Sequence, residues 1–131
     1  MSYQLNSEQR KSVLALDAQS RSIHCVGRVT DWEEVWALKD KDGWLFLKPS
    51  DELEYFPIWP HREYAQVVGK SIYDEESAES LTLDDFMENW LPGMKDDGIK
   101  IGVFPDTEGN MWIMEPEDLR ADLLDEIAKY E

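Results

Sequence analysis

Few side chains in this sequence could perform nucleophilic chemistry, because it contains one cysteine, Cys25, and two histidines, His24 and His61. Cys25 follows His24 directly, and adjacent residues of a helix project about 100° apart, so these two cannot act as nucleophile and base. The sequence also lacks a Gly-x-Ser-x-Gly nucleophile elbow. We interpret Cys25 as a buried free thiol, and the residue inventory favours a protein that is not an enzyme.

Metal and cofactor sites find no support in the spacing of the remaining polar residues. The segment 61–63 has the His-x-Glu order of a zinc deaminase, but that site also needs cysteines that a chain with one Cys cannot supply. Segments 40–43 and 106–109 resemble fragments of calcium loops without the full ligand spacing, and we interpret both as turns. Segment 93–98 has phosphate-loop glycines, yet Ile99 stands where a lysine must follow. We expect no metal and no cofactor.

Aromatic side chains are crowded into residues 32–64, which hold Trp32, Trp36, Trp44, Tyr55, Phe56, Trp59 and Tyr64. Two interpretations are open. The rings can line a sheet that helices cover on both sides. Alternatively, they form a partly exposed patch that binds a partner or a small ligand, because Trp and Tyr anchor interfaces. The second interpretation predicts a binding site at Trp36, Trp44 and Trp59, with His61 and Glu63 at its rim.

Charge is distributed unevenly along the chain, whose 29 acidic and 13 basic side chains give a net charge of −16. Residues 71–131 hold 18 of the acidic and only 4 of the basic side chains. Such a surface repels nucleic acid and anionic membranes, so we expect neither as a partner. The acidity either serves solubility alone or forms a face that docks a basic protein partner.

Length and composition indicate one folded domain over residues 1–131, since the chain is 42% hydrophobic and contains six Trp. Its apolar runs are too short to span a bilayer, and its N-terminus is polar rather than signal-like. A single cysteine excludes an internal disulfide and a multi-cysteine zinc site. We therefore expect a cytoplasmic protein.

The pattern of apolar residues predicts five helices and five strands. The helices are expected over residues 6–17, 19–29, 60–68, 82–91 and from 116 onward, and the strands over residues 35–39, 44–48, 54–59, 99–104 and 111–114. Asp42-Gly43 and the segment 105–110 are turn signals that close two hairpins. This order indicates an α+β fold: one domain with a mostly antiparallel sheet of about five strands, two hairpins plus an edge strand, and flanking helices.

Several details of this layout can be checked individually. Asn6 or Ser7 is expected to cap the first helix, which runs to about Asp17. In the second helix, Ile23, Val26 and Val29 are expected on one apolar side. Pro57 should place its strand at a sheet edge or end it, and Pro92-Gly93 should end the fourth helix. Residues 71–80 should form a loop, with partial structure through Ile72 and Tyr73 as the alternative.

The segment Phe56-Pro57-Ile58-Trp59-Pro60-His61-Arg62-Glu63-Tyr64-Ala65 resembles a bacterial family of small proteins known as domain of unknown function 2750. The similarity extends to residues 5–6, 14–17, 32–38, 42–44, 90–94, 103–105 and 115–119, and so covers nearly the whole chain. The resemblance implies a soluble, single-domain bacterial protein without an assigned activity. It carries no catalytic residues over to this chain.

Taken together, these features favour a non-enzymatic interaction module, an immunity-type or regulatory binder that presents acidic and aromatic surface. The alternative is a small-ligand-binding protein or hydrolase with a Trp-lined pocket around His61 and Glu63. A structural or oligomerising module is a third possibility, because the last helix is amphipathic. The sequence leaves monomer and homodimer equally open.

Overall fold

The computed structural model describes residues 7–75 and 77–129 of the chain. The helices are α1 (Ser7–Leu14), α2 (Ala18–Trp32), α3 (Arg62–Val68), α4 (Leu83–Asp85), α5 (Leu91–Asp97) and α6 (Pro116–Ala128), and the π-helical turns are η1 (Gly69–Tyr73) and η2 (Phe86–Trp90). The strands are β1 (Glu34–Asp40), β2 (Gly43–Trp44), β3 (Leu47–Ser50), β4 (Leu53–Ile58), β5 (Ser77–Thr82), β6 (Lys100–Val103) and β7 (Trp112–Met114).

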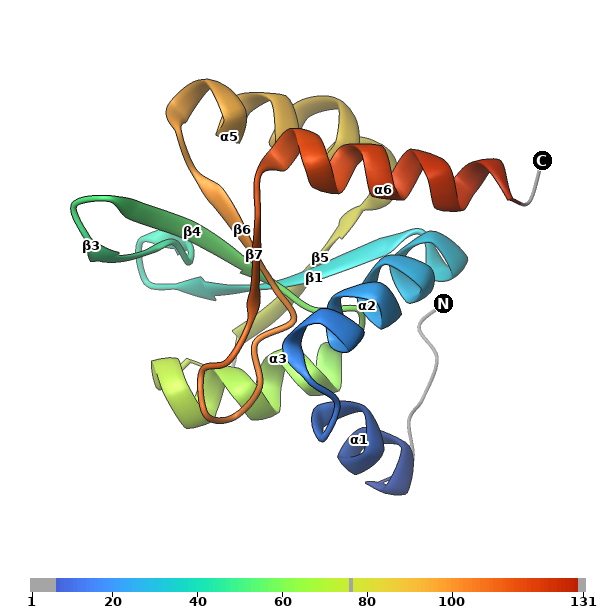
Figure 1. Cartoon of the computed structure of the whole chain (residues 1–131). Coiled ribbons are helices and arrows are strands. Elements are labelled where there is room, and N and C mark those ends of the chain that lie inside the picture. The colour runs from blue at the N-terminus through green and yellow to red at the C-terminus, as the bar shows by residue number, and fades with distance from the viewer. Residues whose placement is uncertain (1–6, 76, 130–131) are drawn as a thin grey trace.

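The strands form two sheets of mostly antiparallel pairs, which confirms the predicted α+β class (Figure 1). One sheet has the order β2-β1-β5 and the other the order β3-β4-β6-β7. The pair β4–β6 is parallel, since a helical crossover separates these strands in the chain. An isolated antiparallel bridge between Trp36 and Trp59 joins β1 to the end of β4 and so connects the two sheets.

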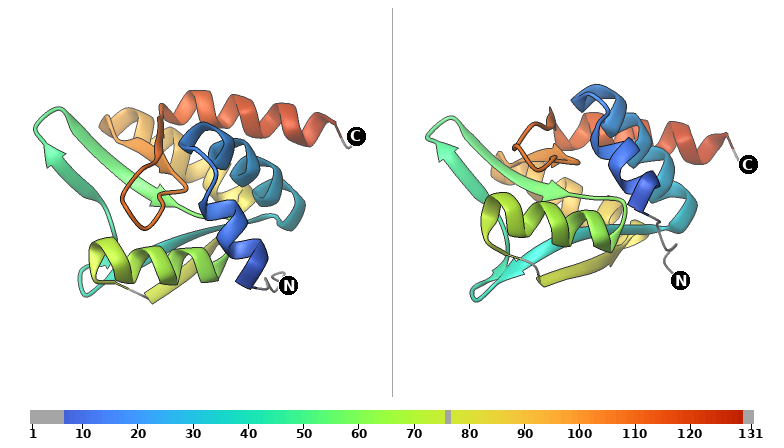
Figure 2. Two further views of the ribbon diagram at one scale, coloured as in Figure 1. Left: turned by 60° about the horizontal axis from the view of Figure 1, so that its bottom comes forward. Right: turned by 90° about the horizontal axis from the view of Figure 1, so that it is seen from below.

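Helices lie on both sides of the strands. In Figure 1, α3 lies below β1 and β5, whereas α5 and α6 lie above them and α2 crosses in front. Figure 2 shows the β3–β4 hairpin projecting away from the helices. The apolar interior is continuous between these layers and includes Leu38, Phe56, Trp59, Phe104 and Leu119. In the described part of the chain, no helix combines the length and apolar character that crossing a bilayer requires.

The first helix ends three residues earlier than the sequence predicts, at Leu14, and the second begins one residue earlier, at Ala18. Asp17 accepts a hydrogen bond from Ser20 N at 2.7 Å, so it caps the start of α2 instead of ending the first helix. The first helix ends at Leu14, and α2 continues to Trp32, where Glu33 adopts a left-handed conformation with φ of 55°. Asn6, one of the two predicted caps of the first helix, lies outside the described residues.

The predicted loop over residues 71–80 is wrong where the strand β5 begins at Ser77, whereas η1 includes Ile72 and Tyr73, for which partial structure was the alternative. β5 pairs with β1 along its full length, from Glu34 opposite Thr82 to Lys39 opposite Ser77. Most β5 side chains are polar and exposed, with Leu81 buried, which is the composition of an edge strand. A strand of this kind lacks the apolar alternation on which sequence-based prediction depends.

The two proline-based predictions have different outcomes. Pro57 lies in β4, which is inside its sheet rather than at an edge, but the strand ends one residue later, at Ile58, as the second of the two predicted alternatives has it. β3 pairs with β4 only as far as Tyr55, so the missing N–H of Pro57 faces a stretch that β3 does not reach. Pro92 does not end a helix but occupies the first turn of α5, where its missing N–H is harmless, and Gly98 ends that helix with φ of 74°.

Candidate functional site

The structure divides the five residues of the predicted aromatic site, Trp36, Trp44, Trp59, His61 and Glu63. Reciprocal backbone hydrogen bonds of 2.9 and 2.8 Å pair Trp36 with Trp59, and His61 and Glu63 follow at the start of α3. Trp44 pairs with Lys39 of β1, three positions from Trp36. Because side chains alternate along a strand, Trp36 and Trp44 project from opposite faces of the sheet. Four of the five residues are therefore neighbours, and Trp44 is separate from them.

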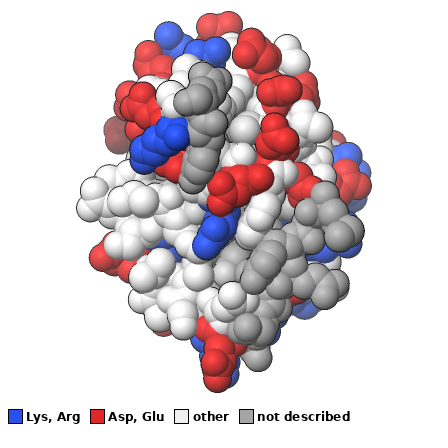
Figure 3. Space-filling model, turned by 90° about the vertical axis from the view of Figure 1, so that its right-hand side faces the viewer, with Lys and Arg blue, Asp and Glu red and all other residues white. Residues whose placement is uncertain are grey.

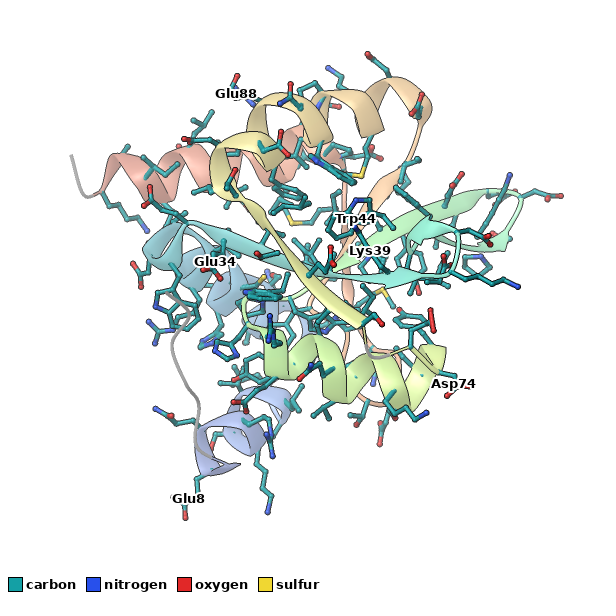
Figure 4. All side chains as sticks on the ribbon, turned by 180° about the vertical axis from the view of Figure 1, so that it is seen from behind. Glu8, Glu34, Lys39, Trp44, Asp74 and Glu88 are labelled. Carbon is teal, nitrogen blue, oxygen red and sulfur yellow. The ribbon has the colours of Figure 1, made fainter. Side chains whose placement is uncertain are left out.

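Trp44 belongs to an aromatic cluster in the core. Its ring packs edge-on against Trp90 and Phe56, at centroid distances of 5.3 and 6.3 Å. The Nζ atom of Lys39 lies 4.7 Å from the Trp44 ring centroid, a cation–π contact. Figure 4 shows Lys39 and Trp44 together, at the end of β1 far from Glu34. These contacts give the half-buried Trp44 a packing role.

The indoles of Trp59 and Trp36 are covered, with exposed fractions of 0% and 5%. Trp59 Nε1 donates to the carbonyl of Pro105 at 3.1 Å, and Trp36 Nε1 donates to Glu34 Oε2 at 2.9 Å. The Arg62 guanidinium lies 4.9 Å from the Trp36 ring centroid. Both rings thus have polar and apolar partners, as expected for a sheet that helices cover on both sides.

His61 is the buried titratable residue of this group, with an exposed fraction of 4%. Its Nδ1 accepts a hydrogen bond from Glu63 N at 3.2 Å, so it caps α3, and its ring packs edge-on against Trp32. Burial lowers the pKa of His61 and Arg62 adds to this, although Glu63 and Glu34 oppose it. The neutral ring therefore carries its proton on Nε2, which is buried and has no hydrogen-bond partner among the described residues.

Beside His61, helix α3 is tied to α1 by an ion pair of 2.9 Å between Glu63 and Arg10. Tyr64 is 1% exposed and packs against Phe104, with ring centroids 4.8 Å apart. Burial raises the pKa of Tyr64 to about 12. In the described structure, the Tyr64 hydroxyl is the second buried side-chain atom without a hydrogen-bond partner. Two buried polar atoms at the start of α3 therefore have no hydrogen-bond partner within residues 7–75 and 77–129.

This group does not form a recognisable catalytic arrangement. Cys25 is 1% exposed, and burial strongly raises the pKa of its thiol, so it holds no reactive thiolate. Within residues 7–75 and 77–129, no three His, Cys, Asp or Glu side chains are grouped in a way that could hold a metal ion. His61 uses one ring nitrogen to cap a helix and buries the other. The arrangement does not contain a nucleophile with its base.

In the acidic half of the sequence, residues 71–131, ten of the 18 acidic residues lie on α4, η2, α5 and α6. All four of its basic residues are in ion pairs, namely Lys95–Glu117, Lys100–Glu115, Arg120–Glu88 and Lys129–Glu126. Three carboxylates of α6, Asp118, Asp122 and Asp125, have no cation partner in the described structure, and we call them the α6 acidic face. Figure 3 faces the side of the molecule at which α6 ends and shows more Asp and Glu than Lys and Arg in the upper part of this view.

The three carboxylates of the α6 acidic face repel one another. They are four and three residues apart, which places them on one side of a helix. The pKa of Asp122 is raised by partial burial, by Asp125 and by Asp118. Like charges at this spacing destabilise a helix by about 0.2–0.5 kcal/mol per pair. The folded protein therefore holds a concentration of negative charge that works against its own stability.

Two grooves run along α6. The α5–α6 groove, of about 360 Å³, is lined by Leu91, Pro92, Lys95, Pro116, Glu117, Arg120, Ala121 and Leu124. The α2–α6 groove, of about 280 Å³, is lined by Ser22, Ile23, Val26, Asp122, Asp125, Glu126 and Lys129. The first groove contains two basic side chains, whereas the second contains one, Lys129, which pairs with Glu126, and has two members of the α6 acidic face on its rim. Of these two grooves, the second therefore combines apolar surface with carboxylates that have no cation partner among the described residues.

Ile23 corrects a sequence prediction. It was expected on the apolar side of its helix with Val26 and Val29, but it is 67% exposed while those two are buried. The buried side of α2 is formed by Arg21, Ser22, Cys25, Val26 and Val29. Apolar character alone therefore misplaced Ile23 by one position around the helix, and the spacing of 22, 25, 26 and 29 is the signal that places it correctly.

Arg21 is a buried residue that the sequence reasoning missed. It is 1% exposed, its Nε donates to the carbonyl of Phe104 at 3.0 Å, and its Nη2 donates to that of Asn110 at 2.8 Å. Asp106 lies 3.6 Å from its Nη1. Arg21 therefore holds the turn between β6 and β7 against α2. Its place on the buried side of α2 follows from the same spacing that places Ile23 outside.

Comparison with known proteins adds one match. A family model described as "Protein of unknown function (DUF2750)" matches residues 23–123. The matched segment contains all five residues of the predicted aromatic site, and it ends within α6, before Asp125. Neither the curated proteins nor the solved structures contain a match to this chain.

Proposed function

The chain belongs to the DUF2750 family, and we propose that it is a protein-interaction module whose α6 acidic face docks a basic protein partner. The observation that carries this proposal is the group of three carboxylates, Asp118, Asp122 and Asp125, that have no cation partner in the described part of the chain, and the pKa of Asp122 among them is raised. Lysine and arginine side chains of a partner would remove the mutual repulsion of these carboxylates on binding. An immunity-type or regulatory binder is the class of module that acts through such docking.

The charge of the whole molecule supports the same proposal. A net charge of −16 attracts a basic partner over distances of about one Debye length, 8–10 Å at ordinary ionic strength. Charge of one sign on one surface mainly increases the rate of association and selects against partners of the same sign. Nucleic acids and anionic membranes are excluded as partners of this face on the same ground.

The proposal is tested by affinity capture from a lysate of the native host with three tagged proteins. They are the unmodified protein, the variant Asp118→Asn/Asp122→Asn/Asp125→Asn, and the control Asp51→Asn/Glu52→Gln/Glu54→Gln, which removes the same charge near the β3–β4 turn. We expect a basic protein that the unmodified protein and the control retain, that high salt releases, and that the α6 variant loses. Equal retention by all three proteins would contradict docking on this face.

A second candidate function is the binding of a small polar ligand beside His61. It is favoured by one observation: His61 Nε2 and the Tyr64 hydroxyl are buried without partners among the described residues. Trp32 and Trp36 lie near this position and would report binding through their fluorescence. A metabolite that shifts the emission of the unmodified protein but not of His61→Asn would support this function. A panel without such a metabolite would exclude its members as ligands.

A further inference from the structure

The α2–α6 groove contains the most exposed large apolar side chain of the described residues. Ile23 is 67% exposed, whereas the other exposed large apolar residues range from 37% to 43%. Val26, one helical turn further along α2, lies at the floor of the groove and is 9% exposed. The exposed apolar surface of Ile23 is available to a binding partner. Because Ile23 is already fixed to a helix, it loses little conformational entropy on binding.

Negative charge lies directly beside this apolar floor. Asp122 and Asp125 line the groove, and neither has a cation partner in the part of the chain that the structure describes. Glu126 is also on the rim, but Lys129 pairs with it at 3.0 Å. The groove thus presents an apolar strip with two unneutralised carboxylates along one side, and the pattern is complementary to alternating apolar and basic side chains.

We infer that the α2–α6 groove binds a basic amphipathic segment of the partner, with an apolar side chain on Ile23 and Val26 and with Lys or Arg on Asp122 and Asp125. This inference rests on the proposed function and specifies where and how the partner docks. A basic segment is the expected occupant because its charge is complementary to the carboxylates of Asp122 and Asp125. A second copy of this chain, also at −16, would be repelled, and so would phosphate-rich surfaces.

The experiment measures the binding of defined peptides by fluorescence anisotropy. The first probe is a labelled peptide of Lys and Leu, about four helical turns long, with Leu at helical spacing. The second probe replaces each Leu by Ser, and the third replaces each Lys by Glu. The proteins are the unmodified chain, Ile23→Ser, Asp122→Asn/Asp125→Asn, and the control Leu124→Ser. Leu124 is 43% exposed on the same helix α6 but lines the α5–α6 groove.

We expect the Lys–Leu peptide to bind the unmodified protein more tightly than either of the other peptides. Ile23→Ser should weaken this binding about tenfold, which corresponds to part of the burial of one isoleucine side chain. Asp122→Asn/Asp125→Asn should weaken it and remove most of its salt dependence. Leu124→Ser should leave the affinity unchanged. All four proteins should be folded, since the substituted side chains are exposed. A cooperative unfolding transition in urea checks this for each of them.

Three results would overturn the inference while leaving the proposed function testable. If the Lys–Ser peptide binds as tightly as the Lys–Leu peptide, the acidic face acts without an apolar anchor. If Leu124→Ser rather than Ile23→Ser removes binding, the α5–α6 groove is the docking site. If no peptide binds while lysate capture retains a partner that depends on the α6 acidic face, that partner is held outside the α2–α6 groove.

Discussion

Asp122 shows at the scale of one residue how the acidic face opposes folding. Its pKa is raised above 3.8 by partial burial and by two neighbouring carboxylates, so folding disfavours its charged form. The resulting loss of stability is present at neutral pH and disappears as the pH falls through about 3.8. We expect Asp122→Asn to raise the free energy of unfolding at neutral pH by about 0.2–0.5 kcal/mol for each repulsive pair removed.

Urea unfolding at neutral pH and near pH 4 measures this gain, and Asp51→Asn is the control for the loss of one negative charge elsewhere. The gain of Asp122→Asn should shrink toward the lower pH and should exceed that of Asp51→Asn. An unchanged or lower stability of Asp122→Asn at neutral pH would mean that the carboxylate has a stabilising contact, and the argument from repulsion would fail.

His61 should make the free energy of unfolding depend on pH in the opposite direction from Asp122. Because burial lowers its pKa below 6.5, the unfolded chain binds a proton more readily than the folded protein. The free energy of unfolding should therefore be highest above about pH 6.5 and should decrease as the pH falls from 6.5 toward the pKa of the folded protein. His24, whose pKa is lowered by burial and by Arg28, adds to the decrease.

The substitution His61→Asn separates these two contributions, because asparagine can cap α3 but does not titrate in this range. We expect the loss of stability between about pH 7.5 and pH 5 to be smaller in His61→Asn than in the unmodified protein. The variant His24→Gln should retain the part of the pH-dependent loss of stability that is caused by His61. A pH dependence that is identical in His61→Asn and the unmodified protein would show that His61 titrates alike in the folded and unfolded states.

At the scale of the elements, Gly69 determines how closely η1 approaches β1. A Cβ at Gly69 would overlap the backbone oxygen of Glu75 and lie 2.6 Å from Leu38 Cδ1, whereas a Cβ at Gly93 in α5 meets no atom within 4 Å. We expect Gly69→Ala to lower the free energy of unfolding by about 1–3 kcal/mol. Gly93→Ala should raise it by up to about 1 kcal/mol, because alanine favours a helix.

Urea denaturation of both alanine variants provides the comparison. Equal stability of the two variants would show that η1 and β1 can move apart to accommodate the added methyl group without loss of packing. η1 continues the helical chain beyond α3 to Tyr73, into the first residues of the segment 71–80 that was predicted to be mostly a loop.

The elements that were predicted correctly are those whose apolar spacing is strong. The helix from Pro116 has Leu119 and Leu123 buried on one side, and the pairing of Lys39 with Trp44 closes the hairpin signalled by Asp42-Gly43. β5 was missed for two reasons: this edge strand buries one large apolar residue, Leu81, and its pairing partner β1 lies 38 to 48 positions earlier in the sequence. Long-range pairing of this kind leaves no local pattern.

The candidate site was predicted less well than the fold. Crowding of aromatic residues cannot show on which face of a strand each ring lies, and the structure places Trp44 and Trp36 on opposite faces. The excess of acidic residues in the second half was readable from composition. Composition could not show which of these acidic residues lack a cation partner, because ion pairs such as Arg120–Glu88 join different helices.

At the scale of the whole molecule, a net charge of −16 should make stability depend on salt. Self-repulsion of a highly charged folded chain is screened as the Debye length falls from about 30 Å at 0.01 M to about 3 Å at 1 M. We expect the free energy of unfolding, measured by urea at rising NaCl concentration, to increase. Asp118→Asn/Asp122→Asn/Asp125→Asn should show a smaller increase, and a salt response unaltered by this variant would place the repulsion elsewhere.

The central claim, that the α6 acidic face docks a basic protein, is tested most directly by zero-length cross-linking. A carbodiimide joins a carboxylate to a lysine amine only where the two are in contact, and mass spectrometry of the products from native-host lysate identifies the linked residues. The account predicts that a basic partner is joined to Asp118, Asp122 or Asp125. Cross-links to a partner that come only from acidic residues elsewhere, such as Asp51 and Glu52, would contradict it.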